Sequence, residues 1–170
     1  MRHIWISIAL LACALGVYAG QQTVGGVGFS GGGSTTAAAY CQLSMPSAVS
    51  LSNVTATVLS PTTETYDTAS MYSAGAPTRV TIPLSGIYLV TAVIEWGADD
   101  TGNRRLFLRS GGSLYLEWDY NFSGNGREQS IASTRYFASG EYLEVLGYQN
   151  SGGALNGQLL NFSVLLLGEV

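Results

Sequence analysis

The chain lacks most of the side chains that enzymes use for catalysis. Among its 170 residues it has no lysine, its single histidine is His3, and its two cysteines are Cys13 and Cys41. Because His3 and Cys13 lie in an apolar N-terminal stretch, the remainder contains no histidine and one cysteine. These absences exclude Ser-His-Asp and Cys-His nucleophile systems, His-ligated metal sites, Schiff-base chemistry and a phosphate-binding lysine. The sequence therefore indicates no cofactor, and Cys41, without a disulfide partner, is predicted to be a small buried residue.

Charge is scarce as well. Charged residues make up 11% of the chain, and the formal net charge is −4, with 7 basic and 11 acidic residues. No charged residue occurs between Gly20 and Thr63, and the arginines form no cluster. A nucleic-acid-binding surface and a polybasic membrane anchor both need such a cluster. We therefore expect no nucleic-acid partner.

The N-terminal stretch is typical of a secretory signal peptide at residues 1–19. Arg2 precedes an apolar run from Ile4 to Val17, and Val17-Tyr18-Ala19 has the small residues of a cleavage site. The run is shorter than the roughly 20 residues that span a bilayer, so no integral membrane span is predicted in the mature form. Localisation would be secreted or at the extracellular surface. Leu10 to Cys13 also matches a bacterial lipobox, which would instead place a lipid at Cys13.

Residues 20–36 are predicted to be a glycine-rich flexible linker or arm. Gly26, Gly28 and Gly31 have the spacing of a dinucleotide-binding motif. No strand pattern precedes them and no helix pattern follows, so chance explains the match in so glycine-rich a segment. The stretch has no sustained G-x-y period and is therefore not a collagen-like stalk.

The segment Gly86–Trp96 is predicted to be a long strand with two apolar faces. One face carries Tyr88, Val90, Ala92, Ile94 and Trp96, and the other carries Ile87, Leu89 and Val93. An antiparallel strand normally keeps one face in water. Both faces of this one need cover, either from other elements of the chain or from a second subunit.

Most of the remaining chain is predicted to form short strands. Apolar or β-branched runs separated by Gly, Pro, Ser and Asn turns occupy residues 37–43, 54–59, 79–83, 104–109, 114–120, 130–137, 142–149 and 162–167. The polar segment 62–68 is predicted to be a loop. No helical period follows the N-terminal stretch. Eight to ten close-spaced strands without helices are typical of an all-β sandwich or barrel.

Three segments in order, Pro83–Tyr88, Ala138–Val145 and Asn161–Leu167, resemble those of the C1q/TNF-like jelly-roll family. The resemblance covers residues 37–170, with Glu141 standing where the family more often has Asp. It implies a jelly-roll β-sandwich of about eight to ten antiparallel strands that forms a compact homotrimer along its inner sheet. It also implies that Leu89, Thr91 and Val93 face the threefold axis, while the opposite face of the same strand fills the core.

Ligand-binding residues are expected in two loop regions, around 99–104 and 120–128. The candidates are Asp99, Asp100, Asn103, Arg104, Tyr120, Asn121, Asn125 and Arg127. Tyr120 belongs to an aromatic-rich segment, with Tyr115, Trp118 and Phe122, that would form a ledge for a glycan or protein partner or else pack in the core. Asp99, Asp100 and Asn103 carry the oxygen ligands that calcium prefers, but their spacing matches no calcium motif, which favours an ordinary surface turn.

Carboxylate catalysis is the enzyme chemistry that the composition leaves open. A glycosidase needs two acids across a sugar cleft, and the candidates are Glu95, Asp99, Asp100, Glu117, Asp119, Glu141 and Glu144. Acids at strand ends and turns are more often simply solvated. The sequence therefore favours a non-enzymatic, exported or surface-displayed trimer that recognises a protein or glycan. The alternatives are a phage virion structural protein, as a head decoration or fibre tip, and then a carbohydrate-active enzyme.

Overall fold

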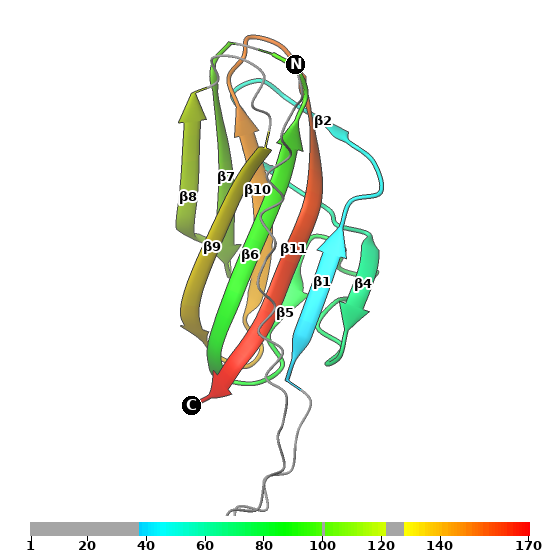
Figure 1. The fold of residues 1–170 in the computed structure, drawn as a ribbon, viewed down its shortest axis with the longest axis vertical. Coiled ribbons are helices and arrows are strands. Elements are labelled where there is room, and N and C mark those ends of the chain that lie inside the picture. The colour runs from blue at the N-terminus through cyan, green and yellow to red at the C-terminus, as the bar shows by residue number, and fades with distance from the viewer. Residues whose placement is uncertain (1–37, 100, 122–127) are drawn as a thin grey trace, which may run out of the picture. The chain divides into compact units, whose positions relative to one another are not determined.

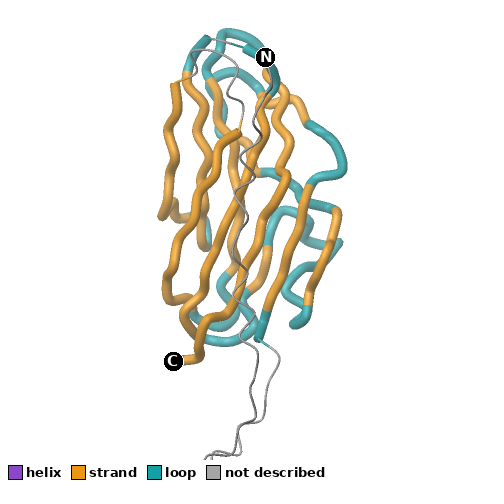
Figure 2. The backbone as a smooth tube through the Cα atoms, viewed as in Figure 1, coloured by secondary structure: helices purple, strands orange, loops and turns teal. Residues whose placement is uncertain are grey.

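The computed structural model describes residues 38–99, 101–121 and 128–170, and within residues 113–121 it describes only the side chains of Ser113 and Leu116. All regular structure in this part of the chain is β-strand (Figures 1 and 2). The strands are β1 (Tyr40–Ser44), β2 (Val49–Leu51), β3 (Thr57–Val58), β4 (Thr63–Asp67), β5 (Val80–Thr81), β6 (Gly86–Trp96), β7 (Asn103–Ser110), β8 (Ser113–Asn121), β9 (Glu128–Phe137), β10 (Tyr142–Gln149) and β11 (Leu155–Glu169). No helix among the described residues is long and apolar enough to cross a membrane.

The strands form two antiparallel sheets. The first has the order β4-β1-β11-β6-β9, with β2 also paired to β11, and the second has the order β3-β10-β7-β8, with β5 also paired to β10. The strands of the first sheet that lie side by side in Figure 1 come from opposite ends of the described sequence: β11 separates β1 from β6. These long-range pairings make the fold a jelly-roll sandwich, as the sequence predicts.

Strand β6 is the long strand expected from the sequence, with the same bounds. Its inward side chains Tyr88, Val90, Ala92 and Ile94 are fully buried, and Trp96 is 1% exposed. They pack against inward residues of the second sheet in one continuous core. Full burial of a large apolar side chain contributes about 1.5–3 kcal/mol, so this face makes a substantial contribution to the stability of the core. The prediction that it fills the core is confirmed.

Cys41 on β1 is also fully buried and is a free thiol, as predicted. Burial, together with the nearby carboxylates of Asp67 and Glu64, raises the pKa of this thiol to about 12. At neutral pH it is therefore a neutral, apolar core side chain rather than a nucleophile.

The prediction of a loop over residues 62–68 is wrong, because Thr63–Asp67 forms the edge strand β4. Its residues are polar and mostly exposed, so they carry no alternating apolar pattern. The strand is stabilised by its antiparallel pairing with β1 and by stacking of Tyr66 on Tyr40, whose ring centroids lie 6.1 Å apart. Neither contact is visible from composition.

Strand β11 begins at Leu155, earlier than the predicted segment 162–167. Its first half is rich in Asn, Gln and Gly, which are poor strand formers. Gly157 is required here, since an added Cβ would lie 2.7 Å from the side chain of Leu51. Gly147 on β10 meets the opposite side of the same leucine at the same distance. The two glycines leave room for Leu51 to reach the core beside Trp96.

Candidate functional site

Three loops meet at one end of the sandwich, the upper end in Figure 1. They are residues 97–102 between β6 and β7, residues 150–154 between β10 and β11, and residues 52–56 between β2 and β3. The Thr101 hydroxyl donates a hydrogen bond to the Ser151 carbonyl oxygen (2.9 Å), and the Gly152 N–H donates to Asn53 Oδ1 (3.0 Å). These bonds join the three loops into one surface, which we call the loop end.

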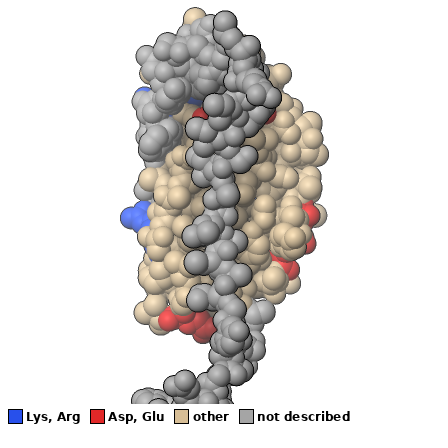
Figure 3. All heavy atoms as spheres, viewed as in Figure 1, with Lys and Arg blue, Asp and Glu red and all other residues tan. Residues whose placement is uncertain are grey.

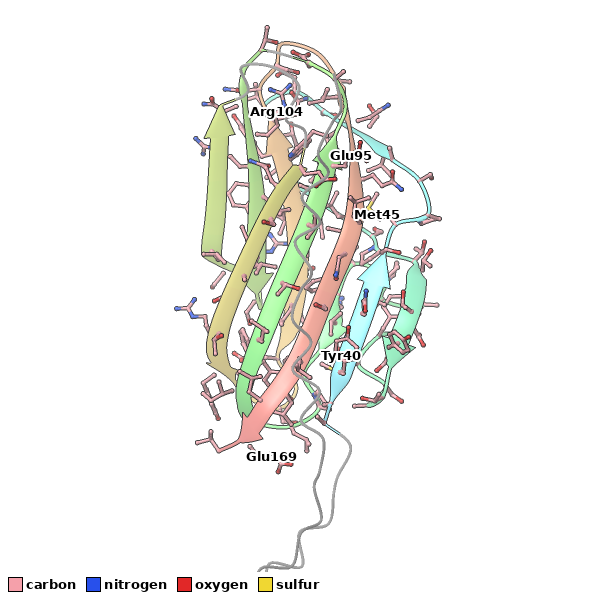
Figure 4. The ribbon with its side chains drawn as sticks, viewed as in Figure 1. Tyr40, Met45, Glu95, Arg104 and Glu169 are labelled. Carbon is pink, nitrogen blue, oxygen red and sulfur yellow. The ribbon has the colours of Figure 1, made fainter. Side chains whose placement is uncertain are left out.

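Arg104 organises the loop end from below (Figure 4). Its side chain is fully buried, and its guanidinium donates hydrogen bonds to the carbonyl oxygens of Thr101 (2.6 Å) and Asp99 (2.8 Å). Gln129 Nε2 donates to the Arg104 carbonyl oxygen (3.0 Å), and Trp96 Nε1 donates to Gln129 Oε1 (2.7 Å). Arg104, predicted as a ligand contact, thus lies beneath the loop that it holds, and any effect on a ligand passes through that loop.

Gln149 holds the loop at residues 150–154 from within the core, as Arg104 holds the loop at residues 97–102. Its side chain is fully buried, and its Nε2 donates to the carbonyl oxygens of Leu51 (3.0 Å) and Gly153 (2.8 Å). Its Oε1 accepts a hydrogen bond from the Ser151 N–H (2.8 Å). Buried polar groups are tolerated when they are satisfied in this way, and satisfied networks make a structure rigid. The described backbone of the loop end is therefore anchored to the core by hydrogen bonds from buried side chains.

The roles of Gln129 and Gln149 were not predicted from the sequence. The available signal was a polar residue in the inward phase of a strand. Gln149 shares its phase with Leu143 and Val145, and Arg104 shares its phase with Leu106 and Leu108. A charged or amide side chain at an inward position must find hydrogen-bond partners, and the nearest unpaired groups at a strand end are loop carbonyls.

Asp99 is the predicted site residue that lies most clearly on the surface of the loop end. Its Oδ1 accepts hydrogen bonds from the Thr101 N–H (2.8 Å) and from the Thr101 hydroxyl (2.6 Å), whose single proton is shared with the Ser151 carbonyl oxygen. These bonds, aided by the Arg104 charge 3.6 Å away, hold the pKa of the Asp99 carboxyl below its usual value. The carboxylate thus shapes a turn, and the described residues contain no group of three His, Cys, Asp or Glu side chains able to hold a metal ion.

The other predicted ligand residues are only partly placed. Asn103 is half-buried at the start of β7, and its backbone N–H donates to Asn150 Oδ1. The backbone register pairs Arg104 with Tyr120 and Asn103 with Asn121, so β8 ends beside the loop end. Asp100, Asn125 and Arg127 lie outside the described residues.

The outward face of the first sheet is a second candidate surface, which we call the first-sheet face. Along β6 it presents Leu89, Thr91 and Val93, all half-buried. On β11 their cross-strand neighbours are Leu165, Ser163 and Asn161, on β9 they are Thr134, Ala132 and Ser130, and Tyr40 and Gln42 follow on β1. None of these eleven described positions is charged. Figure 3 views the molecule from the side of this sheet, with Asp and Glu atoms in red at the right and lower edges.

The outward face of the second sheet differs sharply. Arg109 on β7 forms an ion pair with Glu144 on β10, with an N–O distance of 2.7 Å. On the same two strands the Arg105 guanidinium lies 5.3 Å from the ring centroid of Tyr148. Between these two pairs the same face carries Phe107 and Leu146, which are 8% and 6% exposed, so it combines charged contacts with buried apolar side chains.

Two cavities lie near the ends of the sandwich, and each has one carboxylate in its lining. A cavity of about 210 Å³ is bordered by Glu95, Trp96 and Asn156. A second, of about 430 Å³, is bordered by Arg135, Tyr136 and Glu141. A retaining glycosidase needs two carboxyl groups about 5–5.5 Å apart across a cleft, and the described residues that line each cavity supply only one.

Glu141 and Glu144 already have partners, and three of the other candidate acids are not described. Glu144 is paired with Arg109, and Glu141 Oε2 accepts a hydrogen bond from the Ala138 N–H (2.9 Å). The side chains of Glu117 and Asp119, and the whole of Asp100, lie outside what the structure describes.

The two antiparallel sheets and their strand order define a jelly-roll domain. No protein-family model and no curated protein matches the chain. Among solved structures, the Eiger TNF of S. frugiperda superposes with a TM-score of 0.60 at 14% identity, covering 78% of this chain and 94% of that one. The globular domain of the zebrafish complement 1qA protein superposes with a TM-score of 0.57 at 12% identity, covering 78% and 99%. The chain thus has the jelly-roll fold of these C1q/TNF structures, which is the fold that the sequence resemblance implies.

Proposed function

We propose that this domain is the head of a non-enzymatic homotrimer that binds a protein or glycan at its loop end. The trimer is proposed because of the side chains on the first-sheet face. A sheet surface in permanent contact with water normally carries charged side chains, whereas the buried centre of a protein interface is depleted of them. The eleven uncharged positions around Thr91 fit the second description. A trimer through this face would cover Leu89 and Val93, apolar side chains that the single chain leaves half-buried.

The loop end is the proposed ligand surface because it is polar and its described backbone is anchored to the core. Arg104 and Gln149 hold its backbone from within the core, so the loops lose little conformational entropy when a partner binds. The described polar groups at this surface include Asp99, Asn103 and Asn150, and the end of β8 lies beside them. In this proposal residues 1–19 direct export and residues 20–36 tether the head, which would act outside the cell.

The solution mass of the chain from residue 20 to residue 170, measured by light scattering beside that of the complete chain, tests the trimer. Three times the chain mass is expected. A monomer at micromolar concentration would contradict the proposal.

Recognition is tested separately by screening the trimer against glycan and protein arrays. Binding to any glycan or protein that the screen identifies should weaken when Asn103 or Asn150 is replaced by alanine. Turnover of any glycan during the screen would contradict the non-enzymatic part.

A further inference from the structure

The larger of the two cavities lies at the end of β7 that is opposite the loop end, toward the lower ends of β7 and β9 in Figure 1. It is bordered by Ser110 and Ser113 on either side of the β7–β8 turn, by Arg135 and Tyr136 near the end of β9, and by Glu141 in the turn before β10. Sites for small molecules commonly have volumes of about 300–1,000 Å³. The cavity, at about 430 Å³, is therefore large enough for one small ligand.

Polar residues occupy inward positions at this end of the sandwich. The cavity lies where the edge strands of the two sheets, β8 and β9, approach each other. Arg135 is the cross-strand neighbour of the fully buried Tyr88, so it belongs to the inward phase of β9. Ser110 continues the inward phase of Leu106 and Leu108 on β7. The apolar core thus gives way to a polar cavity at this edge.

Arg135 differs from the other polar residues at inward positions. Arg104 and Gln149 are fully buried and donate hydrogen bonds to loop carbonyl oxygens. Arg135 is exposed and borders a cavity. It is therefore accessible to a ligand that enters the cavity from solvent.

The lining combines groups that only donate hydrogen bonds with groups that only accept them. The Arg135 guanidinium is a donor, a carboxylate such as that of Glu141 is an acceptor, and the two serine hydroxyls can act as either. The Ala138 N–H donates to Glu141 Oε2 (2.9 Å), which fixes the carboxylate and leaves Oε1 as an acceptor. A simple anion would be repelled by Glu141 and a simple cation by Arg135. Neighbouring hydroxyl groups of a sugar can accept from the one and donate to the other.

Tyr136 adds an aromatic side chain at the border of the cavity, and the residue is 52% exposed. A tyrosine ring offers an apolar surface to the C–H groups of a sugar while its hydroxyl remains in water. We infer that this cavity binds one unit of a neutral saccharide between the β7–β8 turn and the end of β9. The site is separate from the loop end and depends neither on the ligand proposed there nor on the proposed trimer.

The first test is a titration of the complete chain, labelled with nitrogen-15, with glucose, galactose, mannose and N-acetylglucosamine, followed by NMR of the backbone amides. One sugar unit has few atoms, so a dissociation constant on the order of 1–10 mM is expected. The amides of Ser110, Ser113 and Glu141 should shift, and those of Asp99 and Thr101 should not. The absence of shifts with all of these sugars, or shifts confined to the loop end, overturns the inference.

Glycine and inorganic phosphate, titrated in the same way, test whether the site selects a sugar. Glycine carries both charges without hydroxyl groups, and phosphate carries negative charge alone. Both are expected to bind more weakly than the best of the sugars. Tighter binding of either one at the cavity overturns the assignment of a neutral saccharide.

Arg135→Met tests the donor while keeping most of the length of the side chain. The dissociation constant of the best sugar is expected to rise by about 10-fold or more, because a hydrogen bond from a charged group is lost. Arg79→Met is the matched control, since Arg79 is also exposed and is not among the described residues that border the cavity. An unchanged constant for Arg135→Met, or an equal rise in both variants, overturns the inference.

Ser113→Leu gives a second reading that leaves every charge in place. Ser113 is exposed in the single chain, so a larger side chain is tolerated there and occupies part of the cavity. Binding of the sugar is expected to be lost, and thermal unfolding of each variant checks that it remains folded. A folded Ser113→Leu variant with unchanged affinity overturns the inference.

Discussion

The two outward faces of the sandwich belong to the same fold but differ in chemistry. The second sheet carries Arg105, Arg109 and Glu144 at outward positions, each in contact with an oppositely charged or aromatic side chain. The first sheet carries hydroxyl, amide and apolar side chains at the corresponding positions around Thr91. Both faces satisfy the β-strand pattern equally well. The difference shows that the two antiparallel sheets of one sandwich carry different outward chemistry, and in our proposal the first of them faces a protein surface.

Placing a charge at the centre of the first-sheet face should have the largest effect. Val93→Asp is expected to convert the trimer to a monomer, because an unpaired charge buried in an interface costs about 3–5 kcal/mol. Light scattering measures the mass. Tyr148→Asp on the second sheet is the matched control, and its mass should not change because Arg105 lies beside the new carboxylate. Equal masses for the two variants would remove the contrast between the faces.

The second sheet has one arginine that points inward, and its removal should have the next largest effect. Arg104→Met keeps the length of the side chain but leaves the carbonyl oxygens of Thr101 and Asp99 without their donors. The free energy of unfolding should fall by about 2–4 kcal/mol. Urea denaturation measures it, with Arg79→Met as control, since Arg79 is exposed and stacks on Tyr142 at 4.7 Å. A similar loss in both variants would mean that burial of Arg104 is unimportant.

Removing a like-charge pair at the rim of the first-sheet face should have a smaller effect of opposite sign. Glu95 and Glu128 lie directly across from each other on β6 and β9. Like charges in this arrangement repel, so Glu128→Gln should stabilise the domain by about 0.2–1 kcal/mol at low salt. Glu169→Gln, whose cross-strand neighbour is Gly86, is the control. Stabilisation that persists in 1 M salt would point away from electrostatics.

The smallest effect concerns acid and the loop end. The pKa of Asp99 is lower in the folded state, chiefly because of its hydrogen bonds to Thr101. A lowered pKa contributes stability above the unfolded value of about 3.9, and this contribution disappears as the pH falls through the folded pKa. The difference in unfolding free energy between the parent and Asp99→Asn should therefore shrink below about pH 4. Urea denaturation at pH 7, 4 and 3 measures it, and a difference that grows in acid would contradict the assignment.

Much of the fold follows from local pattern. Strands β6 and β10 begin and end where the sequence predicts, because each is a run of mainly apolar residues bounded by glycine or polar turns. Strand β4 and the first half of β11 do not follow from pattern, because their residues are polar and their pairing comes from distant segments. The loop-end residues, too, are only partly predictable from the sequence. The sequence predicts that Asp99 and Asn103 lie at a turn, but only the tertiary structure shows that Arg104 lies beneath it.

The sequence by itself determines that this chain is all-β, that it lacks histidine and lysine chemistry in its main part, and that β6 needs cover on both faces. Composition and a period of two suffice for these conclusions because they describe local geometry. Only the tertiary structure decides which uncharged residues gather on one sheet, which loops Arg104 and Gln149 join, and that Arg135 borders a cavity. Those facts depend on strand pairings between segments far apart in the chain, and a local pattern carries no information about register between distant strands.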